Sequence, residues 1–170
     1  MGHLVLSTLH TNDAATSITR LVDIGIDPYL IAASLNGVLA QRLVRNICPK
    51  CKQVCQVSGR VARHVERAGI KPDQVFHGAG CENCRNSGYV GRVGIYEMLI
   101  IDEQFREMIN KDSSVNNMRR VFHESGRRSL FDDGMMKVKQ GLTTVEEVLR
   151  VTEVYGINEN EVFVENIDSD

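Results

Sequence analysis

The cysteines are the residues in this chain best suited to chemistry. Four of them form two pairs, Cys48-x-x-Cys51 and Cys81-x-x-Cys84, and a fifth, Cys55, stands apart. Each pair can present two thiolates on one tight turn, so two facing turns supply four sulfurs at the corners of a tetrahedron. Because this closed donor set is typical of structural zinc, we predict a Zn²⁺ site with the four paired cysteines as ligands.

Other interpretations of the cysteines stay open. A dithiol redox pair and unrelated buried thiols are the alternatives to a metal, and iron also accepts cysteine sulfur. His64 and His77 lie between the pairs and could replace a ligand, although surface imidazoles are the default, and Cys55 is expected to be a structural free thiol. Residues 1–5 show neither a basic region nor a signal cleavage site, so we expect a cytoplasmic protein with reduced thiols.

The composition is that of a globular protein. The 170 residues include 20 Lys and Arg against 22 Asp and Glu, and 42% are hydrophobic. This length corresponds to one domain or two small ones. The near-neutral charge gives no case for nucleic-acid binding, and no apolar run approaches the ~20 residues of a membrane helix.

Charge is distributed unevenly along the chain. Residues 48–92 hold eight Lys and Arg against three Asp and Glu, whereas residues 153–170 hold six acids and no base. Together with the cysteine pairs, these shifts predict boundaries near residues 47, 92 and 152. The predicted parts are residues 1–47, a metal-binding module at 48–92, a strand and helices at 93–155, and an acidic tail at 156–170. The tail is expected to be a solvated extension or, through residues 162–164, an added strand.

Hydrophobic periodicity predicts an α/β layer followed by helices. Strands are expected at residues 3–9 and 93–101. Two helices are expected in the first part, one after Asn12-Asp13 and one over residues 29–41 that is apolar on nearly every side. The remaining helices are expected at 58–70, 101–109, 115–122, 130–138 and 145–151, the last begun by Thr144.

Searches for standard catalytic motifs return nothing. The chain has no GxxxxGK[ST] phosphate-binding loop and no GxSxG nucleophile turn, and His123-Glu124 lacks the second histidine of HExxH. Motifs alone therefore describe a zinc-binding α/β fragment.

Several sequence blocks in a fixed order change this interpretation. They are Ser7–Ala14, Gln41-Arg42-Leu43, the two cysteine pairs, Gly91–Glu97 and the closing Thr143–Arg150. In this order the blocks resemble the GspE/PilB family of bacterial type II secretion and type IV pilus-assembly ATPases. The resemblance runs from about residue 3 to residue 152.

The resemblance implies a RecA-like P-loop core that hydrolyses ATP as a homo-hexamer. Such a motor acts at the cytoplasmic face of the inner membrane, to which it is bound peripherally through a platform protein. By resemblance, His10 would lie near the γ-phosphate as a sensor or hydrogen-bond donor, with Thr8 and Thr11 in support. Arg42 would contact phosphate or a neighbouring subunit. The simpler alternatives are a strand-end histidine satisfied by backbone and a solvated arginine at a helix end.

The family's Walker A loop, acidic box and Walker B strand would precede His3. We therefore expect this chain alone neither to bind ATP and Mg²⁺ tightly nor to hydrolyse ATP. The expected fold is an incomplete, C-terminal part of a RecA-like core with a four-cysteine zinc module and an all-α C-terminal subdomain. Two alternatives are a free-standing zinc-binding interaction module and a zinc-ribbon nucleic-acid binder. The sequence does not specify whether the system is for secretion, pilus assembly or DNA uptake, nor which substrate is exported.

Overall fold

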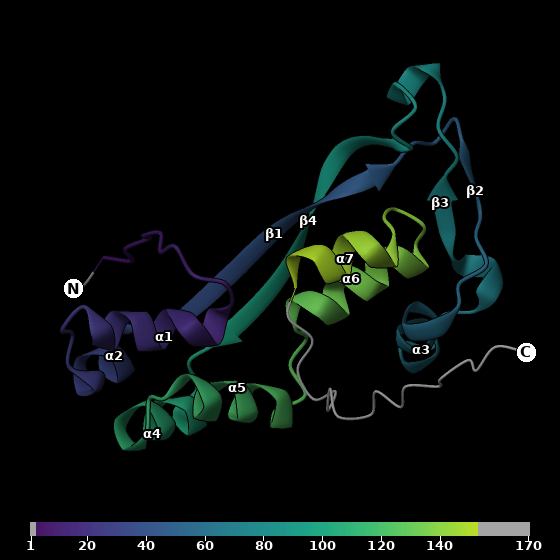
Figure 1. Ribbon diagram of the computed structural model, residues 1–170. Coiled ribbons are helices and arrows are strands. Elements are labelled where there is room, and N and C mark those ends of the chain that lie inside the picture. The colour runs from purple at the N-terminus through teal and green to yellow at the C-terminus, as the bar shows by residue number, and fades with distance from the viewer. Residues whose placement is uncertain (1–2, 153–170) are drawn as a thin grey trace, which may run out of the picture.

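The longest feature of the fold is an antiparallel strand pair. In a computed structural model, which describes residues 3–152, β1 (Gly37–Ile47) pairs with β4 (Tyr89–Ile100). The register places Gly37 opposite Ile100 and becomes irregular after Arg45. Figure 1 shows the pair crossing the molecule as a twisted ribbon with helices gathered along one side.

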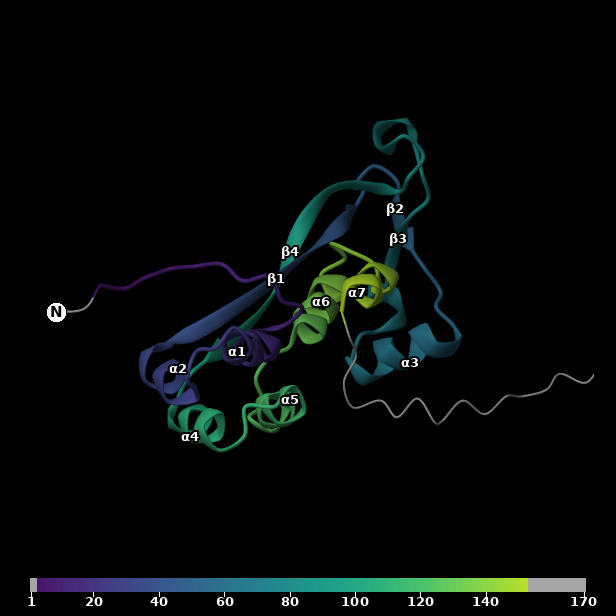
Figure 2. The same ribbon diagram turned by 60° about the vertical axis from the view of Figure 1, so that its left-hand side comes forward.

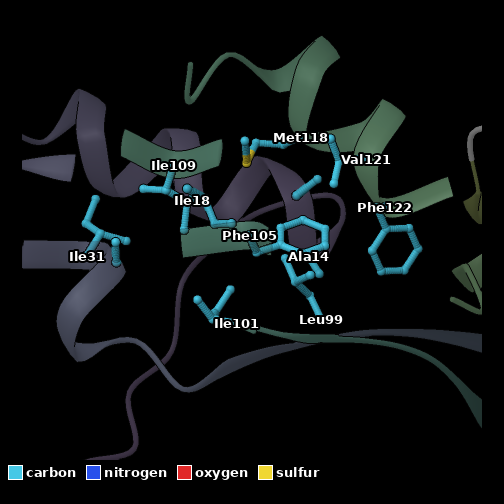
Figure 3. Packing of buried hydrophobic residues seen from close by; sticks show 12 residues of the cluster. Ala14, Ile18, Ile31, Leu99, Ile101, Phe105, Ile109, Met118, Val121 and Phe122 are labelled. Carbon is cyan, nitrogen blue, oxygen red and sulfur yellow. The ribbon is translucent and has the colours of Figure 1, made fainter. Parts of the chain in front are cut away.

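Four helices share one core at the end of the ribbon where β1 begins. They are α1 (Ala14–Asp23), α2 (Pro28–Ser34), α4 (Glu103–Lys111) and α5 (Val115–Glu124). Phe105 is fully buried in this core, and Figure 3 shows it between Ile18 and Leu99. Aspartates begin three of these helices, because the side chains of Asp13, Asp27 and Asp102 each accept a backbone N–H of the first turn.

A second core joins the C-terminal helices to the segment between β1 and β4. Helices α6 (Leu130–Lys139) and α7 (Val145–Val151) pack with α3 (Gly59–Arg67). The same segment contains a two-stranded sheet of β2 (Lys52–Val54) and β3 (Phe76–Gly78) and the 3₁₀ turns η1 (Pro72–Gln74) and η2 (Glu82–Cys84). Figures 1 and 2 both show this segment at the far end of the ribbon from α2.

Most predicted helices are confirmed. Helices α1 and α3 to α7 and strand β4 lie within a few residues of the positions that periodicity predicts. Thr144 begins α7 as expected, since its side chain accepts the Glu147 N–H. Among the described helices, none has the length and apolar character needed to cross a bilayer.

The predicted strand over residues 3–9 is wrong. The segment has no regular structure, and Leu4, Val5 and Leu6 are 76%, 80% and 88% exposed. A strand requires a hydrogen-bonded neighbour, and within residues 3–152 no strand pairs with this segment.

The predicted helix over residues 29–41 is also wrong in its second half. Helix α2 ends at Ser34, and β1 begins at Gly37. The apolar residues of this stretch fit either periodicity, and the pairing of residues 37–41 with residues 96–100 of β4 decides for the strand. Asn36-Gly37 is a turn signal that separates the two elements.

Of the two boundaries that charge predicts near residues 47 and 92, one coincides with the end of a strand and the other does not. Residue 47 is the last residue of β1, whereas residue 92 lies inside β4, so the segment between the paired strands is 48–88. The predicted acidic tail at 156–170 lies outside the described residues.

A glycine allows α6 and α7 to pack closely, and it yields a stability prediction. A Cβ placed on Gly134 would lie 2.5 Å from Val148 Cγ1. We expect Gly134→Ala to lower the free energy of unfolding by about 1–3 kcal/mol, although alanine is intrinsically the better helix former. Urea unfolding followed by circular dichroism measures this. The control adds Gly134→Ala to a Val148→Ala protein, in which the clashing methyl groups are gone. In that protein Gly134→Ala should change the free energy of unfolding little or raise it. A loss of stability as large as in the native protein would contradict the steric cause.

Candidate functional site

The four paired cysteines converge at the far end of the ribbon. Cys48 follows β1 directly, and the second pair lies at η2, just before β4. The Sγ–Sγ distances are 3.8 Å for Cys48–Cys81, 3.8 Å for Cys51–Cys84 and 3.7 Å for Cys81–Cys84, and all four sulfurs lie within 4.8 Å of one another. Tetrahedral sulfurs about 2.3 Å from a metal would lie about 3.8 Å apart, so the geometry fits a four-coordinate ion.

Backbone N–H groups point at the sulfurs and favour thiolates. Burial opposes ionisation of Cys84, but the N–H groups of Cys81 and Gly88 lower its pKa to about 6. Burial and the neighbouring thiols raise the pKa of Cys51 to about 12. Thiolates this close to one another repel, so the fully ionised set needs a cation among them. The four cysteines could therefore hold a metal ion.

Two glycines let the chain cross itself beside the sulfurs. A Cβ on Gly78 would overlap the carbonyl of Gly88, and a Cβ on Gly88 would overlap that of Gly78. The Gly88 carbonyl accepts the Cys48 N–H at 2.9 Å, and its own N–H donates to Cys84 Sγ at 3.3 Å. This crossing fixes the position of one cysteine pair relative to the other.

The other candidate ligands lie outside the sulfur cluster. Cys55 donates to the Gln56 carbonyl, and His64 is buried with its ring edge against Phe131. His77 lies beside Gln53 across the β2–β3 pair. Neither histidine belongs to the metal-ligating group found among the described residues.

A second candidate site lies where the N-terminal segment enters α1. Thr8 and His10 are exposed, and Thr11 Oγ1 lies 2.7 Å from Ser17 Oγ. The Arg42 guanidinium on β1 donates to Asn12 Oδ1 at 2.7 Å. Burial opposes ionisation of the Asp13 carboxyl, but hydrogen bonds from Thr16 and the guanidinium of Arg119 lower its pKa.

A buried glutamate joins this segment to the ribbon. Glu97 on β4 accepts the Ala14 N–H at 2.9 Å and the Leu130 N–H at 3.2 Å, so one carboxylate holds the first residues of α1 and α6. Helix N-termini favour negative charge. Burial nevertheless raises the pKa of Glu97 above its ordinary range.

Four of the five sequence blocks meet at one cavity. A cavity of about 230 Å³ is lined by Asn12 and Asp13 of the first block, Arg42 of the second, Glu97 of the fourth and Arg150 of the last. The lining combines the guanidiniums of Arg42 and Arg150 with the carboxylates of Asp13 and Glu97, so positive and negative charges are balanced around the cavity.

The predicted residues are only partly brought together there. Of the four nucleotide-site candidates, Arg42 alone lines the cavity, and Thr8 and His10 are exposed. Sequence reasoning missed Asn12, Glu97 and Arg150 as site residues. Glu97 lies on the inward face of a strand otherwise filled by apolar residues, and that signal could have identified it.

A third carboxylate lies on α7 beside the segment that contains the four cysteines, residues 48–88. Glu147 is 2% exposed and accepts the Arg45 N–H at 2.9 Å, the Arg45 guanidinium at 2.7 Å and that of Arg150 at 2.9 Å. Arg45 also lies over the Tyr89 ring. Burial opposes ionisation of Glu147, but these guanidiniums lower its pKa to about 2.

Comparison with known proteins identifies the family. The family model described as "Type II/IV secretion system protein" matches residues 1–150. The chain belongs to this family. The type II secretion system protein E of Pseudomonas aeruginosa is 49% identical over 151 residues, which are 89% of this chain and 30% of that protein. The type IV pilus assembly ATPase TfpB of Acinetobacter baylyi is 43% identical over 88% of this chain and 26% of its own length.

Two solved structures share the fold. The pilus retraction motor PilT with bound ADP matches 91% of this chain and 34% of its own, with a TM-score of 0.57 and 24% identity. The DotB ATPase of Legionella pneumophila matches with a TM-score of 0.50 over 84% of this chain and 30% of its own, at 17% identity. The chain spans about 30% of the length of its curated secretion relatives, so it corresponds to a part of such proteins.

The sulfur cluster predicts how two cysteine variants will differ in metal content. We expect the purified protein to hold one metal ion per chain and Cys51→Ser to lose most of it, because three sulfurs leave the set incomplete. Cys55→Ser should keep the ion. Metal analysis by plasma mass spectrometry measures both, with thermal unfolding in parallel. Full metal content in Cys51→Ser, or loss in Cys55→Ser, would rule out this ligand set.

Glu147 predicts a pH dependence of stability. Its folded pKa of about 2 lies below the ordinary 4.5, so its contribution is present above about pH 4.5 and is lost as the pH falls toward 2. We expect Glu147→Gln to cost about 2 kcal/mol at pH 7, at the low end for a buried pair because both arginines are half exposed.

The matched control for this variant is the exposed neighbour Glu146→Gln. Urea unfolding from pH 7 to pH 3 should show a weaker acid dependence for Glu147→Gln than for the parent and the control. Equal slopes in all three proteins would contradict the role of Glu147, whereas metal release at low pH affects all three alike.

Proposed function

We propose that these residues form the C-terminal part of a cytoplasmic, hexameric motor ATPase that drives type II protein secretion or type IV pilus assembly. The convergence of the family's sequence blocks on one cavity carries the proposal, since residues from four separated segments meet there. The longer secretion and pilus relatives support it. Peripheral attachment to the inner membrane through a platform protein belongs to the same proposal.

Within that motor, the segment around His10 contributes to a nucleotide site that the rest of the protein completes. An exposed imidazole can donate a hydrogen bond to charge that develops on a transferring phosphoryl group. Thr8 and Thr11 support the segment, and Arg42 holds Asn12 at the cavity. ATP and Mg²⁺ are bound only in the longer protein, because residues 1–170 contain no GxxxxGK[ST] loop.

The metal at the four cysteines is zinc in this proposal, with a structural role. Four thiolates close the coordination shell, so no ligand position remains for a water or substrate. A net charge of −2 for zinc with four thiolates suits a segment rich in Lys and Arg. A colourless metal-loaded protein would distinguish zinc from iron.

The alternative is a zinc-binding interaction module without catalysis. The excess of positive charge over residues 48–92 favours it, because such a surface suits an acidic partner. Binding of the platform protein's cytoplasmic domain to the isolated chain is compatible with both functions, so nucleotide turnover must separate them.

ATP hydrolysis tests the proposal. We expect no turnover from residues 1–170 alone. In the longer protein that joins this part to a phosphate-binding loop, His10→Ala should lower kcat about 10²–10³-fold, the loss typical for one transition-state donor. His3→Ala, an equally exposed histidine of the same segment, is the control. Unchanged kcat in His10→Ala, or His10-dependent turnover by residues 1–170, would refute the assignment.

A further inference from the structure

Helix α3 presents a row of arginines. Arg60, Arg63 and Arg67 are exposed and are spaced three and four residues apart, so they share one face of the helix. Among the residues that the structure describes, no carboxylate forms an ion pair with any of the three. The opposite face of α3, including Val65, packs into the second core.

The position of Arg60 is unfavourable for the helix. Arg60 occupies the first turn, which contains no acidic residue, although a helix N-terminus favours negative charge. Burial lowers the pKa of His64, and the three arginines lower it further. His64 is 4% exposed with its ring edge against Phe131. Its pKa is therefore sensitive to the electrostatic potential beneath the arginine face.

The chain itself carries an anionic segment of matching character. Residues 153–170 contain no Lys, Arg or His, and their acids are Glu153, Glu159, Glu161, Glu165, Asp168 and Asp170. The family model matches residues 1–150, so this segment lies outside the matched region.

Helix α7, which packs beside α3, ends at Val151, two residues before this segment. Leu149 of α7 packs against the same buried cluster as Val61 of α3. Eighteen residues can span up to about 60 Å when extended, which far exceeds what is needed to reach the neighbouring helix. A tether of this kind gives an effective concentration in the millimolar range, so weak ion pairs suffice for docking.

We propose that residues 153–170 dock on the arginine face of α3 as an intramolecular acidic partner. The docked segment neutralises the row of guanidiniums and covers the most basic helix of residues 48–88. Any other anionic partner of this face must then displace it. Docking is held by exposed ion pairs, so it weakens with salt.

Amide NMR spectra of the ¹⁵N-labelled, metal-loaded full chain test this docking. The variant Glu159→Gln/Glu161→Gln/Glu165→Gln should shift the amide signals of α3 at low salt. The His64 ring should titrate at a higher pH in the native chain than in this variant, because the docked acids offset the arginines. Both differences should vanish near 1 M salt, where the Debye length is about 3 Å.

Two further variants complete the test. Asp23→Asn/Glu103→Gln/Glu107→Gln removes the same charge from exposed positions elsewhere and should leave α3 unchanged. Arg60→Gln/Arg63→Gln/Arg67→Gln should in turn shift the signals of residues 153–170.

The results that overturn the proposal are equally specific. One is that the amide signals of α3 do not shift at low salt when the acidic segment is changed. The other is that they shift by the same amount in the Asp23→Asn/Glu103→Gln/Glu107→Gln control. Shifts that disappear on dilution would assign the contact to a second copy of the chain and would also overturn intramolecular docking.

Discussion

The pairing of β1 with β4 is the constraint on which the rest of the structure depends. The two strands are separated by 41 residues, and closing a loop of that length costs roughly 3 kcal/mol of chain entropy beyond a constant term. In return, both cores form on one side of the paired strands, and two buried carboxylates connect strand to helix. Glu97 extends from β4 to α1 and α6, and Glu147 extends from α7 to the Arg45 backbone.

The sulfur cluster lies where that entropy cost can be offset. Cys48 comes one residue after β1, and Gly88, whose carbonyl accepts the Cys48 N–H, comes one residue before β4. An ion bound there joins the two ends of the intervening segment. Structural zinc supplies about 10 kcal/mol or more at neutral pH, well above the loop-closure cost. A metal at this position would therefore fix the strand register as well as the segment.

Local signals in the sequence were sufficient for most of the helices and for the grouping of the four cysteines. Asp13 and Thr144 begin helices through side-chain bonds that span three residues, so spacing alone predicts them. The cysteine pairs likewise have a fixed short spacing. Strand β1 was misassigned because its apolar residues satisfy a helical period too, and only a partner far along the chain selects the strand. Glu97 was missed as a site residue for the same reason, since its two donors lie 83 and 33 residues away.

The two buried carboxylates connect the ends of the molecule in different ways. Glu97 accepts two neutral backbone N–H groups, and burial raises its pKa, whereas two guanidiniums lower the pKa of Glu147. Glu147 and the Arg45–Tyr89 contact fix α7 to the metal end of the ribbon, and Glu97 fixes the start of α1 to its middle. Both carboxylates therefore attach helices to the same continuous strand pair. The sulfur cluster lies at one end of that pair, and Asn12, next to the start of α1, is bound by Arg42 of β1.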